Sequence, residues 1–148
     1  MKLVVQRVKR AEVLVNSRVT GSIKKGVLVF VAVAKNDTDK DADYLAEKLV
    51  ELRLFPDEQD KMNLSLRGVR GEILVVSQFT LLADCIKGRR PSFDAAAEPT
   101  IAEKLYNHFV EKLKNSSLKV ETGEFRAMME VSLVNDGPVT FILDSLPR

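Results

Sequence analysis

The run from Gly26 to Ala34, GVLVFVAVA, is apolar on both faces of any strand it forms. A strand that alternates apolar and polar residues needs cover on one face only, whereas a continuous apolar run has to be covered on both. The segments 3–8, 11–15 and 18–23 alternate in strand fashion, and Asn16-Ser17 fits a two-residue hairpin turn. The first third of the chain therefore predicts an antiparallel meander followed by a deeply placed central strand.

Two later segments change from the strand period to the helical one. Leu45, Leu49 and Leu52 recur along one face of about 38–54, and a similar apolar stripe runs along about 99–114. Further strands are expected at 72–80, 119–123, 128–134 and 139–143. We therefore predict one α+β domain over residues 1–148, with a curved barrel-like or two-layer, mostly antiparallel sheet and two amphipathic helices packed outside.

The charge of the chain excludes some classes of partner. Its 23 basic and 21 acidic residues give a formal net charge of +2, so the chain lacks the global basic signature of a protein that coats nucleic acid. The longest uncharged apolar stretch, 27–34, is far shorter than the roughly 20 residues of a membrane helix. The start of the sequence lacks the core of a signal peptide. We expect a cytoplasmic protein without a membrane partner.

Cys85 and His108 are each the only residue of their type. A single cysteine forms no internal disulfide, and such a residue is usually small, apolar and buried. A single histidine removes two-histidine chemistry and His-rich zinc sites, and we expect His108 to face solvent or to pack within a helical segment. We therefore predict no metal and no cofactor, in a chain that lacks most conventional catalytic side chains.

The apolar strand at 72–80 ends in the polar run Ser77, Gln78, Phe79, Thr80. A rigid strand fixes the first residues of the loop that follows it, so side chains and free backbone N–H groups at this end are candidates for a site. The alternative is that Ser77 and Thr80 only form a local turn. No neighbouring His, Lys or terminal amine is in place to activate Thr80 as a nucleophile.

A Gly-Pro dipeptide, Gly137-Pro138, lies between the last two strand-like runs within the segment NDGPVT, 135–140. Proline cannot donate a hydrogen bond to a sheet, so this step forces the backbone out of regular pairing. Asn, Asp and Gly tolerate the positive φ values of tight turns. The residues themselves predict a hairpin turn here.

The two segments SQFTL, 77–81, and NDGPVT, 135–140, together resemble the motif pair of the D-aminoacyl-tRNA deacylase family. The segments VVQRV, 4–8, and RRPSF, 89–93, are similar to that family as well, so the resemblance spans nearly the whole chain. It implies a homodimeric editing hydrolase that cleaves the ester between a D-amino acid and the terminal adenosine of tRNA, and that also accepts glycine. Its partner would be the 3′ end of tRNA and not DNA.

The resemblance also implies a role for each motif residue. Gly137 and Pro138, joined by a cis bond that Arg7 supports, would project into the pocket of the other subunit and exclude L-residues. Backbone N–H groups of Phe79 and Thr80 would stabilise the oxyanion, while the 2′-hydroxyl of the tRNA assists catalysis. Ser77 and Gln78 would bind substrate. Met129 would line the pocket, although ordinary core packing explains it equally well.

Three questions stay open at the level of the sequence. Thr80 could act as a nucleophile through an acyl-enzyme, or the chain could be a dimeric tRNA-binding module without catalysis. The basic cluster Lys87, Arg89 and Arg90 is a candidate for tRNA phosphate contacts, but it also fits a solvated charged loop.

Overall fold

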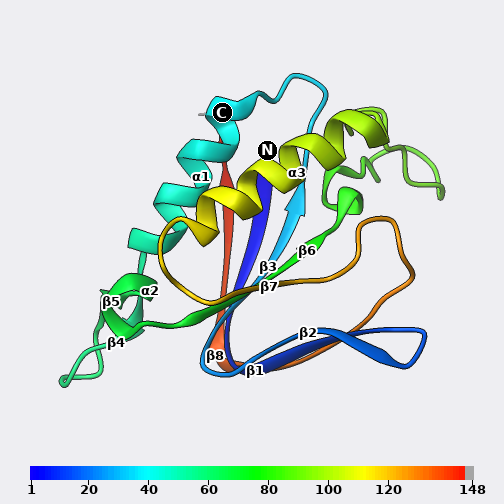
Figure 1. The fold of residues 1–148 in the computed structure, drawn as a ribbon. Helices are drawn as coiled ribbons and strands as arrows, with labels where there is room; N and C mark the ends of the chain where they lie inside the picture. Colours follow the sequence, from blue (N-terminus) through cyan, green and yellow to red (C-terminus); the bar gives the residue numbers. More distant parts are fainter. Residues whose placement is uncertain (146–148) are drawn as a thin grey trace.

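The computed structural model describes residues 1–145 and places α-helices on one side of a strongly curved sheet (Figure 1). The elements in chain order are β1 (Lys2–Val15), β2 (Arg18–Ile23), β3 (Gly26–Ala32), α1 (Asp39–Glu51), β4 (Arg53–Pro56), β5 (Met62–Ser65), α2 (Leu66–Val69), β6 (Glu72–Ser77), the 3₁₀ turn η1 (Phe79–Leu82), α3 (Pro99–Lys114), β7 (Val120–Thr122) and β8 (Glu130–Asp144). No described helix is both long and apolar enough to cross a membrane.

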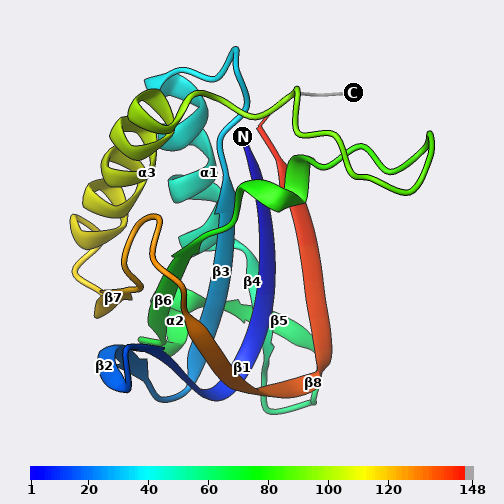
Figure 2. The same ribbon diagram turned by 90° about the vertical axis from the view of Figure 1, so that its right-hand side faces the viewer.

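The main sheet has the strand order β2-β1-β3-β6-β7, and β8 pairs with β1. β1 runs antiparallel to β2, β3 and β8, whereas β6 runs parallel to β3 and to β7. The sheet curls until β2 lies near β7 (Figure 2), where a Cβ added to Gly21 would lie 2.6 Å from the carbonyl oxygen of Thr122. This nearly closed, mostly antiparallel sheet confirms the predicted barrel-like α+β fold.

α1 and α3 pack together over one face of the sheet, close to the segments predicted for them (Figures 1 and 2). The predicted stripe of α1 places Leu45 and Leu49 fully in the core, while Leu52 ends the helix and is only partly buried. The central strand β3 is buried along nearly its whole length, as its apolar sequence predicts. The described chain has a second core inside the curl of the sheet, built from apolar side chains of β1, β2, β3 and β6.

The predicted hairpin at Gly137-Pro138 is wrong, because β8 continues through it as one strand. Both halves of β8 pair with β1: Val8 faces Asn135 and Gln6 faces Thr140, so the single residue Arg7 lies opposite the four residues 136–139. The proline, which has no N–H to donate, is accommodated in this bulge. Regular pairing resumes at Gln6 on one side and, after a second irregularity between Val8 and Arg10, at Arg10 on the other. Long-range pairing with β1 thus overrides the local turn chemistry.

The hairpin predicted at Asn16-Ser17 is confirmed. Val15 and Arg18 face each other across the turn, and the two loop residues have φ values of 49° and 63°. Two successive positive φ values are typical of the tight turn that suits the twist of antiparallel strands.

Candidate active site

A cavity of about 700 Å³ lies where β6 ends, between the start of α3 and the connection from β7 to β8. It brings together four of the residues predicted from the sequence: Ser77, Gln78, Phe79 and Met129. Its other lining residues are mainly apolar: Val76, Phe93, Ala96–Pro99, Ala102, Phe125–Met128 and Val131. Sequence reasoning had not connected residues 96–102 and 125–127 with the end of β6.

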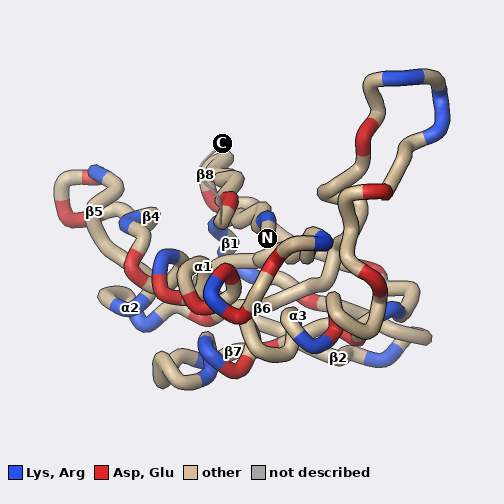
Figure 3. Tube along the Cα trace, turned by 90° about the horizontal axis from the view of Figure 1, so that it is seen from above, with Lys and Arg blue, Asp and Glu red and all other residues tan. Residues whose placement is uncertain are grey.

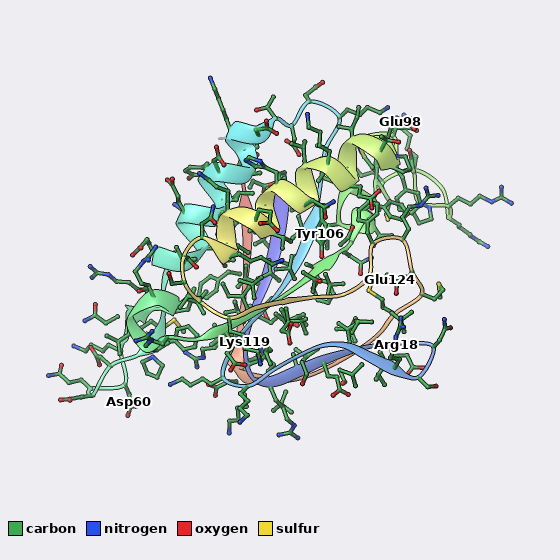
Figure 4. All side chains as sticks on the ribbon, viewed as in Figure 1. Arg18, Asp60, Glu98, Tyr106, Lys119 and Glu124 are labelled. Atoms are coloured by element: carbon green, nitrogen blue, oxygen red, sulfur yellow. The ribbon has the colours of Figure 1, made fainter. Side chains whose placement is uncertain are left out.

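The end of β6 is held firmly before it enters the cavity. The Tyr106 hydroxyl of α3 donates to the carbonyl oxygen of Val75 at 3.1 Å, and the Gly123 N–H donates to the same oxygen at 3.0 Å. Burial raises the pKa of Tyr106, so this donor stays protonated. Figure 4 shows Tyr106 reaching from α3 toward the sheet. The strand therefore presents its last residues from a fixed position.

The backbone changes direction directly after this strand. The Gln78 N–H donates to the Val31 carbonyl at 2.7 Å, after which residues 79–82 form the turn η1. The N–H groups of Phe79 and Thr80 begin this turn and therefore have no acceptor within it. A short helical turn with free N–H groups at its start is suited to an oxygen that gains negative charge.

The Thr80 side chain lies outside the residues that line the cavity and is exposed. The Gln78 amide donates to the Thr80 hydroxyl oxygen at 2.5 Å, and no described His, Lys or carboxylate forms a hydrogen bond with this hydroxyl. A donated hydrogen bond withdraws electron density from the oxygen. The geometry therefore does not activate Thr80 as a nucleophile.

Phe79 and Met129 form part of the apolar wall. The Phe79 ring meets the Phe93 ring edge to face, with centroids 5.0 Å apart, yet Phe79 stays 52% exposed. Met129 packs against the second core and also lines the cavity, and a Cβ added to Gly123 would lie 2.6 Å from its sulfur. Met129 therefore both packs against the core and lines the cavity.

Gly137 and Pro138 are joined by a cis peptide bond and are exposed. They do not line the cavity that holds Ser77 to Phe79 in the same chain. A Cβ added to Gly137 would lie 2.3 Å from the Val139 nitrogen, so the bulge leaves no room for a larger residue there. Gly137 and Pro138 thus lie apart from the four predicted residues that line the cavity.

Arg7, the residue that the family resemblance assigns to the support of Gly137-Pro138, contacts the backbone of the bulge. Its Nε donates to the Asp136 carbonyl at 3.0 Å, and its other guanidinium end donates to the Leu54 carbonyl at 2.7 Å. Arg7 is only 9% exposed. A buried guanidinium bonded at both ends holds the backbone of the bulge against the β4 segment.

Asn135 is a second support, which sequence reasoning missed. Its amide nitrogen donates to the carbonyls of Arg7 and Val139, each at 3.0 Å, and its side-chain oxygen accepts the Val139 N–H at 3.1 Å. The signal was available, because Asn side chains commonly bond to backbone groups near turns and bulges. Asn135 thereby replaces the ladder bonds that the bulge removes.

The basic cluster Lys87, Arg89 and Arg90 lies on a loop that extends away from the body of the protein (Figure 3). Asp84 and Ser92 close the base of this loop with two backbone hydrogen bonds of 2.8 and 2.9 Å. Cys85 lies on the same loop and is exposed, so the expectation of a buried cysteine is wrong: a projecting loop has no core to bury it in. His108 lies in α3, and its Nε2 is 2.8 Å from Oδ1 of Asp43 in α1.

Comparison with known proteins identifies the family. The family model described as D-Tyr-tRNA(Tyr) deacylase matches residues 4–144. Proteins named "D-aminoacyl-tRNA deacylase" from Thermosipho africanus and Thermotoga petrophila are 59% and 57% identical over 145 residues, which cover 98% of this chain and 97% of each relative.

Two solved structures share the fold. One, titled "c-Myc DNA Unwinding Element Binding Protein", is 40% identical with a TM-score of 0.92, over 99% of this chain and 100% of that one. The other, a probable eukaryotic D-amino acid tRNA deacylase, is 18% identical with a TM-score of 0.87 over 97% of this chain and 98% of that one.

The match to the family model and the identity with the two named relatives show that this protein is an enzyme, of the hydrolase class. It belongs to the D-Tyr-tRNA(Tyr) deacylase family.

Proposed function

We propose that this enzyme is an editing hydrolase that cleaves D-aminoacyl-tRNA, and glycyl-tRNA, to the free amino acid and tRNA in the cytoplasm. The observation that carries the proposal is that η1 begins at Phe79, on the wall of a mainly apolar cavity of about 700 Å³, where the first N–H groups of the turn, those of Phe79 and Thr80, have no acceptor within it. An aminoacyl-adenosine needs this combination: apolar walls for base and side chain, and donors for the ester carbonyl.

In this mechanism the ester carbonyl oxygen accepts hydrogen bonds from the N–H groups of Phe79 and Thr80. Water attacks the carbonyl carbon, the oxyanion forms against these donors, and the bond to the ribose 3′-oxygen then breaks as that oxygen takes a proton. The 2′-hydroxyl of the terminal adenosine orients the water, and Ser77 and Gln78 hold the aminoacyl group. The chain thus supplies positioning and charge stabilisation.

Selection between D- and L-substrates falls to Gly137 and Pro138 of the other subunit of a homodimer. Their carbonyl oxygens stand as a fixed wall against the side chain of an L-residue, while glycine has no Cβ to exclude. Each tenfold rejection corresponds to a clash of only about 1.4 kcal/mol. A wall made of backbone, exposed and braced by Arg7 and Asn135, meets this need for rigidity.

The outer strand β8 supports the homodimer. In the described chain β8 pairs with β1 alone, which leaves its other edge open, and Ile142 on this strand is 67% exposed. An open edge beside an exposed apolar side chain is a common place for a second chain to bind. The same strand carries Gly137 and Pro138.

Lys87, Arg89 and Arg90 would contact tRNA phosphates from the projecting loop. Phe93, which directly follows this loop, lines the cavity, so the loop begins next to it. A tRNA whose 3′ end entered the cavity would therefore pass close to the loop and could contact it through its phosphates. We propose tRNA as the partner even though one structural relative is titled a DNA-binding protein. Replacing the three residues with Gln should weaken tRNA binding and reduce its dependence on salt.

The central experiment compares hydrolysis of D-tyrosyl-tRNA and L-tyrosyl-tRNA. We expect rapid release of D-tyrosine, slow or no release of L-tyrosine, and loss of activity when the terminal 2′-hydroxyl is replaced by hydrogen. Equal rates for the two substrates would refute selection by exclusion. Binding of tRNA without any turnover would instead identify a tRNA-binding module, and an acyl-enzyme on Thr80 would establish the nucleophile mechanism.

A further inference from the structure

Arg126 stands in an unusual backbone conformation at the wall of the cavity. It lies in the connection from β7 to β8 with a φ of 66°, the left-handed region that favours glycine. Its side chain is exposed, and none of the ion pairs within the described chain involves it. The nearby Glu124 pairs with Arg18 instead, at 3.7 Å (Figure 4). The Arg126 guanidinium is therefore available to a ligand.

Of the described residues that line the cavity, two carry a charge, and they have opposite signs. Glu98 stands at the start of α3, whereas Arg126 lies in the connection from β7 to β8, which passes below that end of the helix at Glu124 (Figure 4). The substrate that we propose also has one group of each sign near its reactive ester: the α-ammonium of the amino acid and the 5′-phosphate of the terminal adenosine. The cavity and this end of the substrate are thus complementary in charge as well as in polarity.

We propose that Arg126 binds the 5′-phosphate of the terminal nucleotide, which leaves the α-ammonium on the side of Glu98. A guanidinium presents two parallel N–H groups that match a phosphate, so the contact fixes direction as well as affinity. It orients the ester toward the N–H groups of Phe79 and Thr80. This inference rests on the proposed function, and it adds the nucleotide contact that positions the substrate.

The test uses two pairs of probes that differ only in the phosphate. Adenosine and AMP measure binding by titration, and 3′-O-(D-tyrosyl)adenosine and its 5′-phosphate measure hydrolysis. The variant is Arg126→Gly, because glycine accepts the left-handed backbone and should keep the fold. Arg70→Gly is the matched control, since Arg70 is also an exposed arginine with a positive φ, of 52°, but lies outside the cavity. Both variants remove one positive charge.

The wild type should bind AMP about tenfold more tightly than adenosine, and the phosphorylated ester should have a lower KM with a similar kcat. Arg126→Gly should bring both ratios close to one, while Arg70→Gly should preserve them. Arg126→Gln, which keeps a polar side chain but removes the charge and the guanidinium, should behave like Arg126→Gly. Equal wild-type binding of AMP and adenosine, or a phosphate preference that survives in Arg126→Gln, would overturn the inference.

The test of Arg126 and the test of the proposed reaction can fail separately. An AMP preference that depends on Arg126 would stand even if neither ester were hydrolysed, and in that case only the proposed reaction would fail. Conversely, D-selective hydrolysis with no dependence on the phosphate would keep the proposed reaction and remove Arg126 from the site.

Discussion

Replacing Asn135 with Ala should both destabilise the protein and weaken its rejection of L-substrates. The change removes three hydrogen bonds, two to the carbonyls of Arg7 and Val139 and one from the Val139 N–H. Val139 is only 7% exposed, so water replaces these bonds poorly. At about 1 kcal/mol for each bond, the free energy of unfolding should fall by about 3 kcal/mol. For a chain of this size that corresponds to a fall in Tm of roughly 6–12 °C.

The functional consequence follows from the same contacts. Without Asn135 the bulge keeps Arg7 as its remaining side-chain support, so Gly137 and Pro138 can move away from an L-side chain. We expect hydrolysis of D-tyrosyl-tRNA to change little and hydrolysis of L-tyrosyl-tRNA to rise. Each 1.4 kcal/mol of lost exclusion should raise the relative rate on the L-substrate about tenfold.

The assay combines urea unfolding with single-turnover rates on both substrates below the Tm of the variant. Thr140→Val is the matched control: it removes one exposed hydrogen bond, that from Gln6 at 3.1 Å, on the same strand. The control should lose at most about 0.5 kcal/mol and keep its selectivity. If Asn135→Ala matched this control in both stability and selectivity, Asn135 would not be a support of the bulge.

Three further predictions concern other contacts. Thr80→Val should retain most deacylation activity, because the backbone N–H of residue 80 is unchanged; loss of nearly all activity with the fold intact would favour the nucleophile mechanism. Tyr106→Phe removes the hydrogen bond to Val75 and should cost about 1 kcal/mol in urea unfolding. Burial raises the pKa of Tyr106, so the neutral phenol stabilises the fold fully below the ordinary pKa of 10.0, and this stabilisation is lost as the pH rises above that value. The Tm of the wild type should therefore fall more steeply in alkali than the Tm of Tyr106→Phe. The hydrogen bond from His108 lowers the pKa of Asp43 below its ordinary value of 3.8. The stabilisation from the Asp43 carboxylate is therefore present above pH 3.8 and is lost as the pH falls below it. The Tm difference between the wild type and Asp43→Asn should vanish in strong acid.

The elements that could be predicted from the sequence are those whose pattern is local. The apolar run from Gly26 predicts a covered central strand, the leucine spacing predicts α1, and Asn16-Ser17 predicts a hairpin, because each signal lies within the element that it describes. The strands β4 and β5 escaped prediction because each is short and the first ends in Pro56.

The cavity could be predicted only in part. Ser77 to Phe79 follow a strand whose apolar pattern locates them, whereas Phe93, Phe125 and Arg126 reach the same space from loops with no periodic signal. A cavity assembled from three separate segments, 76–79, 93–102 and 125–131, depends on how they pack. Packing of this kind leaves no regular spacing in the sequence.

In the proposed mechanism, the position of Gly137-Pro138 in the middle of β8 would let a short backbone segment act as a rigid wall. At a hairpin end the same residues would be held by one pair of strands and would be free to bend with the loop. Within β8, ladder bonds to β1 hold the chain on both sides of the bulge, and Arg7 and Asn135 bond across it. The bulge therefore leaves Gly137 and Pro138 exposed while restraining the backbone that carries them. A filter that acts through exclusion requires this combination, because a wall that yields by a fraction of an ångström admits the substrate it is meant to reject.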